Sequence, residues 1–291
     1  MIEVKLVGPE AADEVLTVVH AAFGDRPVLD PPGDALAETR ESMARALGQD
    51  GGLIALVEGE LVGALVLDRQ PDWLWLRRVG VLARFRGAGA AHALVAAAEQ
   101  HASGCRGLRL IAREELPQTV QFWRSVGYFV IARRSPYLEM AKLAPTAVML
   151  PDLEATQALG VKLAGLVQPG DVVILTGGLG AGKTTLTKSL GQAMGVRGEV
   201  TSPTFVIARV HPGPTPLVHV DAYRLGGAAE LDDLDLDTDL DDAVTVIEWG
   251  AGLAEALSSD RLEISLDVDP DTEARTATLT PIGARWAQVS L

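Results

Sequence analysis

The sequence predicts a mixed α/β protein of two domains, and three observations support this. The chain has 291 residues, more than a single domain usually contains. Short apolar runs alternate with helical patterns on both sides of a segment with two prolines, residues 142–151. Hydrophobic residues make up 48% of the chain and charged residues 22%, a balance that can form a core and argues against a mainly disordered protein. We therefore expect domains at residues 1–145 and 146–291, with 142–151 as the linker.

The first half is expected to form a mainly antiparallel sheet with helices. Its apolar runs predict strands at 2–7, 53–57, 61–68, 73–82 and 108–112 and closing strands at 128–133 and 137–142. Short turns join the strands between 53 and 82, as in an antiparallel meander. Helical patterns predict helices at 10–23, 34–47, 89–101 and 116–125.

The second half is expected to form a sheet of buried strands covered by helices. Asp152 is a suitable N-cap for a helix over 152–167, and a second helix is expected at 183–194. The apolar runs 172–175, 217–220 and 244–247 are short and continuous, which is typical of strands buried on both faces.

Charge and cysteine content restrict the partners and the compartment. Residues 1–145 carry 16 Lys and Arg against 18 Asp and Glu, a balance of −2, whereas the remainder carries 9 against 21, a balance of −12. The acidic half should repel phosphate backbones, so an RNA substrate would have to be held by a partner protein. The single cysteine, Cys105, allows no intrachain disulfide or zinc cluster. With no long apolar span and no leader-like start, we expect a cytoplasmic protein that does not contact membranes.

The strongest motif is GGLGAGKTT at residues 177–185, between an expected strand and an expected helix. It matches the complete phosphate-binding loop (P-loop) pattern, in which backbone N–H groups and a helix N-terminus surround the phosphates. Lys183 should reach the β- and γ-phosphates, and the Thr184 hydroxyl should bind Mg²⁺. The predicted nucleotide-binding residues are Gly177, Gly178, Leu179, Gly180, Ala181, Gly182, Lys183, Thr184 and Thr185.

Two carboxylates follow the next two apolar runs. Asp221 ends the run 217–220, and Glu248 ends the run 244–247. Ligands of open α/β sheets bind at the carboxyl ends of the strands, so both acids are expected at the phosphate site. Hydrolysis of a nucleotide needs such acids near the metal and the attacking water.

Four motifs together resemble the TsaE family, the ATPase of the bacterial machinery that makes threonylcarbamoyladenosine in tRNA. They are GGLGAGKTT, TSPTF at 201–205, HVDAYRL at 219–225 and IEWG at 247–250, within a similarity over residues 152–277. The resemblance implies ATP and Mg²⁺ as cofactors, and TsaD- and TsaB-like proteins as partners that contact the tRNA. It implies catalytic roles for Lys183, Asp221 and Glu248, in which Lys183 binds phosphate, Thr184 and Glu248 bind Mg²⁺, and Asp221 positions or deprotonates water.

Further residues are interpreted through the same resemblance. It places Trp249 beside the metal acid and Thr156 near the adenine, and it makes 201–205 a switch-like loop over the nucleotide. Gly178 departs from the family, which often has aspartate there. The acidic stretch 230–242 fails as a calcium loop and is expected to be a solvated loop or helix, or alternatively a docking surface. His211 and His219 lack metal-ligand spacing and are interpreted as structural.

A second glycine turn, at residues 86–91, lies between the strand 73–82 and the helix 89–101. It offers a pyrophosphate-sized anion site made of backbone amides, without the lysine of a P-loop. The segments VGVLARFRGAGAAHALV (79–95) and QFWRSVGYFVI (121–131) resemble the GNAT acetyltransferases, over about residues 1–143. The resemblance implies acetyl-CoA binding by Val79, Gly80, Val81, Arg86, Gly87, Ala88, Gly89, Ala90, Ala91 and His92.

One departure from the GNAT pattern concerns proton transfer. Many family members have a tyrosine general acid where this sequence has Trp123, which cannot give a proton to a thiolate. Tyr128 and Tyr137 are the alternatives, unless the acid is dispensable. The acceptor amine is not predicted. Arginine pairs at 77–78 and 133–134 either steer an anionic cofactor or form a solvated basic face.

The sequence therefore predicts a bifunctional protein, a GNAT-like acetyltransferase followed by a TsaE-like, P-loop ATPase. One alternative is a small-molecule kinase on the same P-loop, with Arg197 and Arg209 as the only nearby lid arginines. Another is a nucleotide-gated assembly switch joined to a CoA-binding module without turnover.

Overall fold

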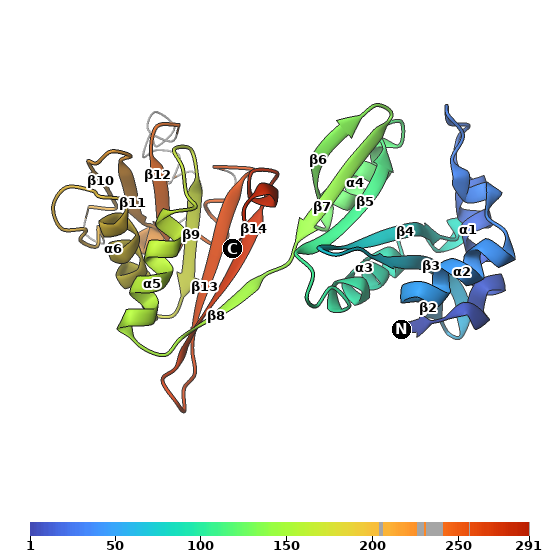
Figure 1. Cartoon of the computed structure of the whole chain (residues 1–291), viewed down its shortest axis with the longest axis horizontal. Helices are drawn as coiled ribbons and strands as arrows, with labels where there is room; N and C mark the ends of the chain where they lie inside the picture. The colour runs from blue at the N-terminus through green and yellow to red at the C-terminus, as the bar shows by residue number, and fades with distance from the viewer. Residues whose placement is uncertain (204–205, 226–229, 231–240, 256, 291) are drawn as a thin grey trace. The chain divides into compact units, whose positions relative to one another are not determined.

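The structure is a computed structural model that describes residues 1–203, 206–225, 230, 241–255 and 257–290 (Figure 1). Contacts between Cα atoms divide the chain into two compact units, Met1–Ala144 and Pro145–Leu291. Each unit contains one seven-stranded sheet, and each is described by itself. Among the described residues, no helix is both long and apolar enough to cross a membrane.

The first unit is a mainly antiparallel sheet with the strand order β1-β2-β3-β4-β5-β7-β6 (Figure 1). The strands are β1 (Ile2–Val7), β2 (Gly52–Val57), β3 (Glu60–Arg69), β4 (Trp73–Val81), β5 (Gly107–Arg113), β6 (Phe129–Arg134) and β7 (Tyr137–Leu143). Its helices are α1 (Ala12–Gly24), α2 (Arg40–Asp50), α3 (Ala90–Gln100) and α4 (Pro117–Ser125). As the sequence predicts, β2, β3 and β4 form an antiparallel meander, and β1 adds to its edge, antiparallel to β2.

Helices cover both faces of this sheet, because neighbouring residues of β2 point to opposite sides. Ile54 packs in one apolar cluster with Val15 of α1 and Met43 of α2. Leu53 packs in another cluster with Leu94 of α3 and with side chains of α4. The sheet is therefore the middle layer, and its two apolar cores hold α1 and α2 on one face and α3 and α4 on the other.

Strands β4 and β5 are parallel, and they separate soon after they begin. Their pairing covers only Trp73–Trp75 against Gly107–Arg109, although β4 continues to Val81 and β5 to Arg113. The pairing of β3 with β4 also shifts register before Gly80, and Arg78 adopts a left-handed φ of 53°. The second half of β4 therefore has no β5 partner along one edge, which leaves backbone groups available at that edge.

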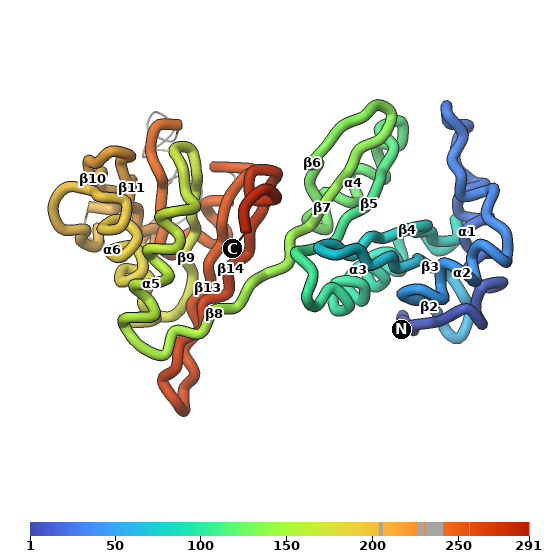
Figure 2. Tube along the Cα trace, in the orientation of Figure 1, coloured from blue at the N-terminus to red at the C-terminus, as the bar shows by residue number. Residues whose placement is uncertain are grey.

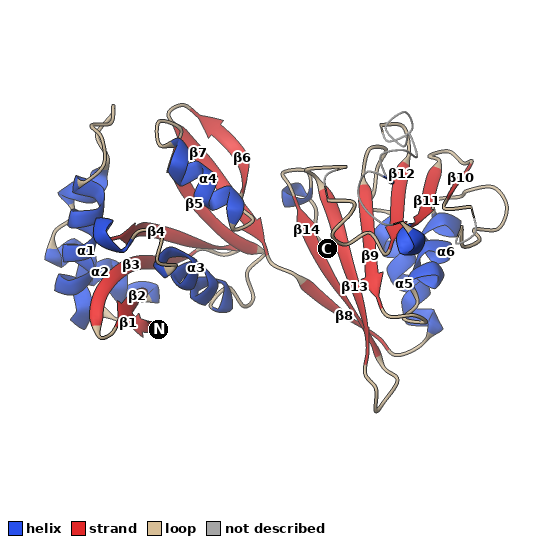
Figure 3. Cartoon of the chain, turned by 180° about the vertical axis from the view of Figure 1, so that it is seen from behind, coloured by secondary structure: helices blue, strands red, loops and turns tan. Residues whose placement is uncertain are grey.

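The second unit has the strand order β10-β11-β12-β9-β13-β14-β8 (Figure 3). Its strands are β8 (Thr146–Leu150), β9 (Val172–Gly177), β10 (Ala208–His211), β11 (Leu217–Asp221), β12 (Val244–Glu248), β13 (Arg261–Val268) and β14 (Arg275–Ile282). The four central strands β11, β12, β9 and β13 are parallel to one another, whereas β10, β14 and β8 pair antiparallel. Helices α5 (Leu153–Ala164) and α6 (Lys183–Ala193) pack against each other, and Figure 2 traces the long β13–β14 hairpin beyond the neighbouring strands.

The structure corrects two expectations from the sequence. Residues 146–150, expected to be linker, form the strand β8 at the edge of the second sheet, paired with β14. The expected helix 34–47 is a short 3-10 helix, Asp34–Ala37, followed by α2 from Arg40. Thr39 separates the two because its hydroxyl accepts the Ser42 N–H while the Ser42 hydroxyl accepts the Thr39 N–H, a capping box that starts a new helix.

Candidate functional site

The P-loop of the second unit leaves the end of β9 and enters α6, as the motif requires. Gly177, Gly180 and Gly182 have φ values of 137°, 76° and 109°, which side chains rarely tolerate. A Cβ on Gly177 would lie 2.4 Å from the carbonyl oxygen of Leu266 on β13, so only glycine fits there. The loop geometry therefore explains the glycines independently of any ligand.

Lys183, the first residue of α6, folds back over this loop. Its Nζ donates to the carbonyl oxygens of Gly177 at 2.8 Å and Gly178 at 2.9 Å. The same Nζ lies 3.7 Å from the ring centroid of Trp249. Burial lowers the pKa of Lys183, while Glu248 and Asp221 oppose that shift. The ammonium group is thus held at the mouth of the loop, where an anion would be a stronger partner than two neutral carbonyls.

The two predicted carboxylates meet beside this loop. Asp221 and Glu248 are register partners at the ends of the parallel strands β11 and β12, and both are buried. Thr184 donates its hydroxyl hydrogen to Glu248 Oε2 at 2.9 Å, and Asp221 Oδ1 accepts the N–H of Tyr223 at 3.1 Å. A cavity of about 220 Å³ is lined by Leu179, Gly180, Gly182, Lys183, Thr184, Thr185, Ser202, Asp221, Glu248 and Trp249.

His219 is the residue of this site that sequence analysis treated as structural. It is fully buried, and its Nε2 lies 2.8 Å from Glu248 Oε1. An imidazole N–H at Nε2 would donate to this carboxylate oxygen. The signal in the sequence is the period of two along a strand, which puts residues 219 and 221 on the same face. The valines on either side, Val218 and Val220, pack in the apolar cluster of the opposite face.

The donor atoms at this site suit Mg²⁺. The Thr184 hydroxyl and the Glu248 carboxylate supply oxygen ligands at the P-loop, and Mg²⁺ prefers oxygen and keeps several waters. Within the described part of the chain, no group of three or more His, Cys, Asp or Glu residues gathers as a metal site.

The other predicted features of the second unit are Thr156, the segment 201–205 and the acidic stretch 230–242. Thr156, on α5, is buried and donates its hydroxyl to the Asp152 carbonyl oxygen at 3.2 Å, and it does not line the cavity. Of the segment 201–205, Ser202 lines the cavity, and 204–205 lie outside the described residues. So do residues 231–240 of the acidic stretch.

A larger cavity, about 1370 Å³, lies in the first unit and is bordered by both β4 and β5, the strands that separate. Its wall includes nine of the ten residues predicted to bind acetyl-CoA. They are Val79, Gly80, Val81, Arg86, Gly87, Gly89, Ala90, Ala91 and His92, whereas Ala88 does not line it. The predicted set is therefore brought together around one cavity.

The glycine turn lies in the wall of this cavity at the start of α3. Gly87 and Gly89 have left-handed φ values of 81° and 88°, and Gly89 is the N-cap of α3, so the first N–H groups of that helix are free of intrahelical partners. Arg86, which pairs with Asp25 at 2.7 Å, lies in the same wall. Burial, together with the charge of Arg86, lowers the pKa of Arg26 to about 10.

The three aromatic residues considered for proton transfer differ in position. Trp123 lines the cavity and packs edge-on against Tyr128, with ring centroids 5.1 Å apart. Tyr128 is buried and does not line the cavity, and burial raises the pKa of its phenol further above 10. Tyr137 does line the cavity and is partly exposed. Of the two tyrosines, only Tyr137 is placed where a substrate could reach it.

Fold and sites together define the classes of the two units. The first has an acetyltransferase-like sheet with separated β4 and β5, and the second is a P-loop NTPase-like sheet with a phosphate-binding loop. The family described as acetyltransferase (GNAT) matches residues 20–128. The family described as threonylcarbamoyl adenosine biosynthesis protein TsaE matches residues 150–277.

Characterised relatives agree with the second match. The tRNA threonylcarbamoyladenosine biosynthesis protein TsaE of Streptomyces coelicolor is 59% identical over 137 residues, which cover 44% of this chain and 92% of the relative. The TsaE protein of Mycobacterium tuberculosis is 47% identical over 156 residues, 50% of this chain and 93% of the relative. This chain therefore belongs to the TsaE family and carries a GNAT-family domain ahead of its TsaE domain.

Solved structures resemble each half separately. Bacillus subtilis YdiB has 32% sequence identity and a TM-score of 0.42, covering 50% of this chain and 90% of that one. The PaiA N-acetyltransferase of Thermoplasma acidophilum, solved with coenzyme A, has 15% identity and a TM-score of 0.44, covering 49% of this chain and 99% of that one.

Proposed function

We propose that the second unit is a Mg²⁺-dependent ATPase that supports threonylcarbamoyladenosine modification of tRNA. The observation that carries this is the continuous contact from the P-loop helix to the strand carboxylates, in which Thr184 bonds to Glu248 and Glu248 to His219. Membership of the TsaE family supports the same pathway.

We assign a separate role to each residue of this site from its position. Lys183 would exchange the carbonyls of Gly177 and Gly178 for phosphate oxygens when nucleotide binds. Thr184 and Glu248 would hold Mg²⁺, whose charge neutralises negative charge that develops on the phosphates. Asp221, on the neighbouring strand and in the wall of the same cavity, would orient the attacking water or accept its proton.

The charge of this half supports indirect contact with tRNA. Its balance of −12 repels a phosphate backbone, so TsaD- and TsaB-like partners would hold the RNA. The alternative of a small-molecule kinase lacks support at the cavity. Neither Arg197 nor Arg209 lines it, and the Arg209 side chain donates to the Thr201 hydroxyl.

For the first unit we propose acetyl transfer from acetyl-CoA to an amine. The free edge of β4 at Val79 to Val81 would pair with the pantetheine arm, and the turn at 86–91 would hold the pyrophosphate. In the reaction the amine lone pair forms a bond to the thioester carbonyl carbon, the C–S bond breaks, and the amine proton finally resides on the CoA thiol or in solvent. Tyr137 is the tyrosine available to deliver a proton to the leaving sulfur.

A reconstitution tests the first proposal. The full chain is combined with ATP, Mg²⁺, tRNA, an activated threonylcarbamoyl donor and the TsaD- and TsaB-like proteins of its own organism, and modified nucleoside is quantified. The parent chain should be required for turnover, and its Lys183→Ala variant should not replace it. Undiminished modification with the variant, or without the chain, contradicts the proposal. Calorimetry with acetyl-CoA separately tests the first unit.

A further inference from the structure

The large cavity of the first unit is lined by ten charged side chains, and their pairing is uneven. All four acidic groups are already engaged by arginines within 3 Å: Asp25 by Arg86 at 2.7 Å, Asp34 by Arg78 at 2.9 Å, Glu115 by Arg113 at 2.8 Å and Glu139 by Arg109 at 2.8 Å. The cavity is thus without an uncommitted carboxylate in the part of the chain that the structure describes.

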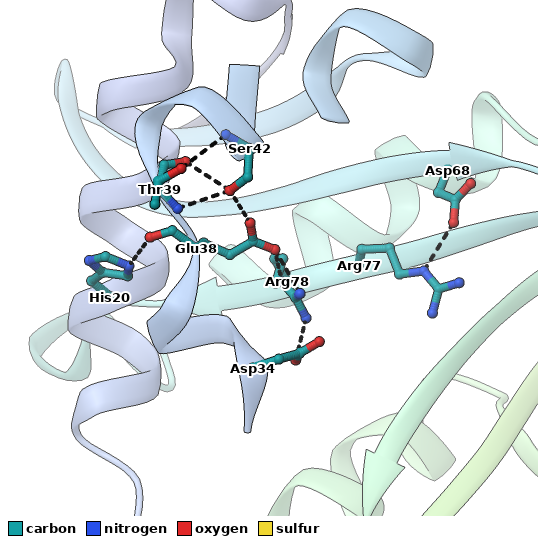
Figure 4. Close-up of polar contacts among 8 residues, drawn as sticks. All are labelled: His20, Asp34, Glu38, Thr39, Ser42, Asp68, Arg77 and Arg78. Carbon is teal, nitrogen blue, oxygen red and sulfur yellow. Dashed lines mark hydrogen bonds and ion pairs between the residues drawn. The ribbon is translucent and has the colours of Figure 1, made fainter. Parts of the chain in front are cut away.

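Most of the arginines in the wall are engaged as well. Figure 4 shows Arg77 pointing to Asp68, and Arg78 held between Asp34 and Glu38. Glu38 is itself fixed, because the Ser42 hydroxyl donates to its carboxylate and His20 Nε2 lies 3.1 Å from its carbonyl oxygen. Of the predicted pair 77–78, neither guanidinium is therefore free to bind a ligand without breaking an existing ion pair.

Two arginines of the wall have no carboxylate partner among the described residues, Arg26 and Arg134. Arg26 stacks on the Phe23 ring, 3.6 Å from its centroid, and lies near enough to Arg86 for that charge to affect it. It therefore belongs to the end of the cavity that carries the glycine turn. Arg134 ends β6, opposite Tyr137 of β7 in the sheet, and so lies on another wall.

We propose that the acetyl acceptor is an amine with a carboxylate close to it, as in an acidic peptide, and that Arg134 binds that carboxylate. The inference rests on the proposed use of acetyl-CoA by this unit. A guanidinium without a partner can form a bidentate pair with a carboxylate, which is among the strongest hydrogen-bonded contacts in proteins. A polyamine or a basic peptide would instead meet a wall with six arginines against four acidic groups, and each of those carboxylates is already engaged.

The neighbouring residue supplies a matched control. Arg133 is also exposed and also at the end of β6, but it pairs with Glu114 at 3.3 Å and does not line the cavity. Arg133→Gln and Arg134→Gln remove the same charge one residue apart. Any effect of net charge alone should appear in both variants, whereas a direct contact should appear only in the second.

The test uses the full chain, saturating acetyl-CoA and three acceptors: a tripeptide of glycine followed by two aspartates, its counterpart with two lysines, and spermidine. CoA release gives the kinetics, and calorimetry with CoA present gives acceptor binding. The acidic peptide should be preferred by at least about tenfold in kcat/KM. Arg134→Gln should raise its KM about tenfold with little change in kcat or in the KM for acetyl-CoA, and Arg133→Gln should match the parent.

Several results overturn this assignment. They are a preference for spermidine or the lysine peptide, equal effects of the two variants, or failure of the acidic peptide both to bind and to react while acetyl-CoA binds. Absence of acetyl-CoA binding to the parent is a different failure, because it removes the proposed acetyltransferase function itself.

Discussion

Glu248 and His219 lie side by side in the second unit, with Oε1 and Nε2 2.8 Å apart and both side chains almost completely buried. The other carboxylate oxygen, Oε2, accepts the hydroxyl of Thr184 at 2.9 Å. The carboxylate is thus held from two sides, by the strand β11 and by the P-loop helix α6. Its orientation is fixed before any ligand arrives, which would lower the cost of ordering it in its proposed role as a Mg²⁺ ligand.

Replacing His219 should show how much this orientation contributes. We expect His219→Leu to lower the free energy of unfolding by about 1–3 kcal/mol, because it leaves the buried Glu248 carboxylate with one hydrogen-bond partner fewer. His219→Gln keeps a donor and should recover part of that loss and part of the Mg²⁺-dependent nucleotide affinity. Urea denaturation measures the free energy of unfolding, and calorimetry with and without Mg²⁺ measures the nucleotide affinity. Equal behaviour of the two variants would mean that the hydrogen bond contributes little.

Lys183→Ala should weaken ATP binding roughly ten- to a hundredfold, because charge-assisted contacts to phosphate are each worth about 1.5–3 kcal/mol. Lys188→Ala is the control. It lies on the same helix, is half exposed and pairs with Glu199 at 3.5 Å. Calorimetry should find ATP affinity reduced only in the first variant, with circular dichroism unchanged in both. Undiminished affinity of Lys183→Ala would exclude it as the phosphate ligand.

Substitutions of Glu248 and Asp221 should have different effects, because the two carboxylates are proposed to have different roles. We expect Glu248→Ala to reduce the Mg²⁺-dependent part of nucleotide affinity, since Glu248 is the acid bonded to Thr184. Asp221→Asn keeps a similar shape and should retain binding while hydrolysis is lost. Titrations with and without Mg²⁺ and a phosphate-release assay distinguish the outcomes. If both variants lose binding to the same extent, the separate roles are wrong.

Gly89→Glu should abolish acetyl-CoA binding and leave ATP hydrolysis unchanged. The position has φ 88° and caps α3, so a side chain strains the turn and a carboxylate repels the phosphates. Gly104→Glu offers a matched control, because Gly104 has φ 80°, open space around its missing Cβ, and no place in the cavity wall. Calorimetry that finds both variants binding acetyl-CoA like the parent would leave the turn without a role in cofactor binding.

Burial of the Tyr128 phenol should make the stability of the protein depend on pH. Its hydroxyl is buried with no hydrogen-bond partner among the described residues, and burial raises the pKa of the phenol above its unfolded value of 10. Above pH 10 the unfolded chain therefore holds fewer protons than the folded one, and stability should fall by about 1.4 kcal/mol per pH unit through this group. The measurement is thermal unfolding of Tyr128→Phe and of the parent between pH 8 and 11. The difference in stability between the two proteins should be constant below pH 10 and should change above it, because only the parent loses stability through this phenol. A difference that does not change with pH would contradict the assignment.

Much of the architecture can be predicted because local signals agree with tertiary ones. The P-loop lies between β9 and α6, where a strand and a helix are expected from the apolar patterns, and Asp221 and Glu248 end neighbouring parallel strands. The glycine turn of the first unit similarly connects β4 to α3. In these places the backbone geometry requires particular residue types, so the spacing of those residues in the sequence predicts the structure.

Other features depend on contacts that the apolar pattern alone does not reveal. The segment of strand β8 looks like linker because Pro145 and Pro151 flank it, and its strand is formed by pairing with β14, more than a hundred residues later. The break before α2 depends on the Thr39 cap, which competes with an otherwise helical pattern. His219 becomes part of the site through Glu248, and Arg134 stands out only once the partners of the other arginines are known.

The joint between the two units also has a genetic consequence. Strand β7 ends at Leu143 in one sheet and β8 begins at Thr146 in the other, and every described strand belongs wholly to one side or the other. A gene boundary between the codons for Ala144 and Pro145 would therefore interrupt no strand pairing in either sheet. Each unit thus carries its complete sheet, and because one message encodes both, the two units are made in equal numbers.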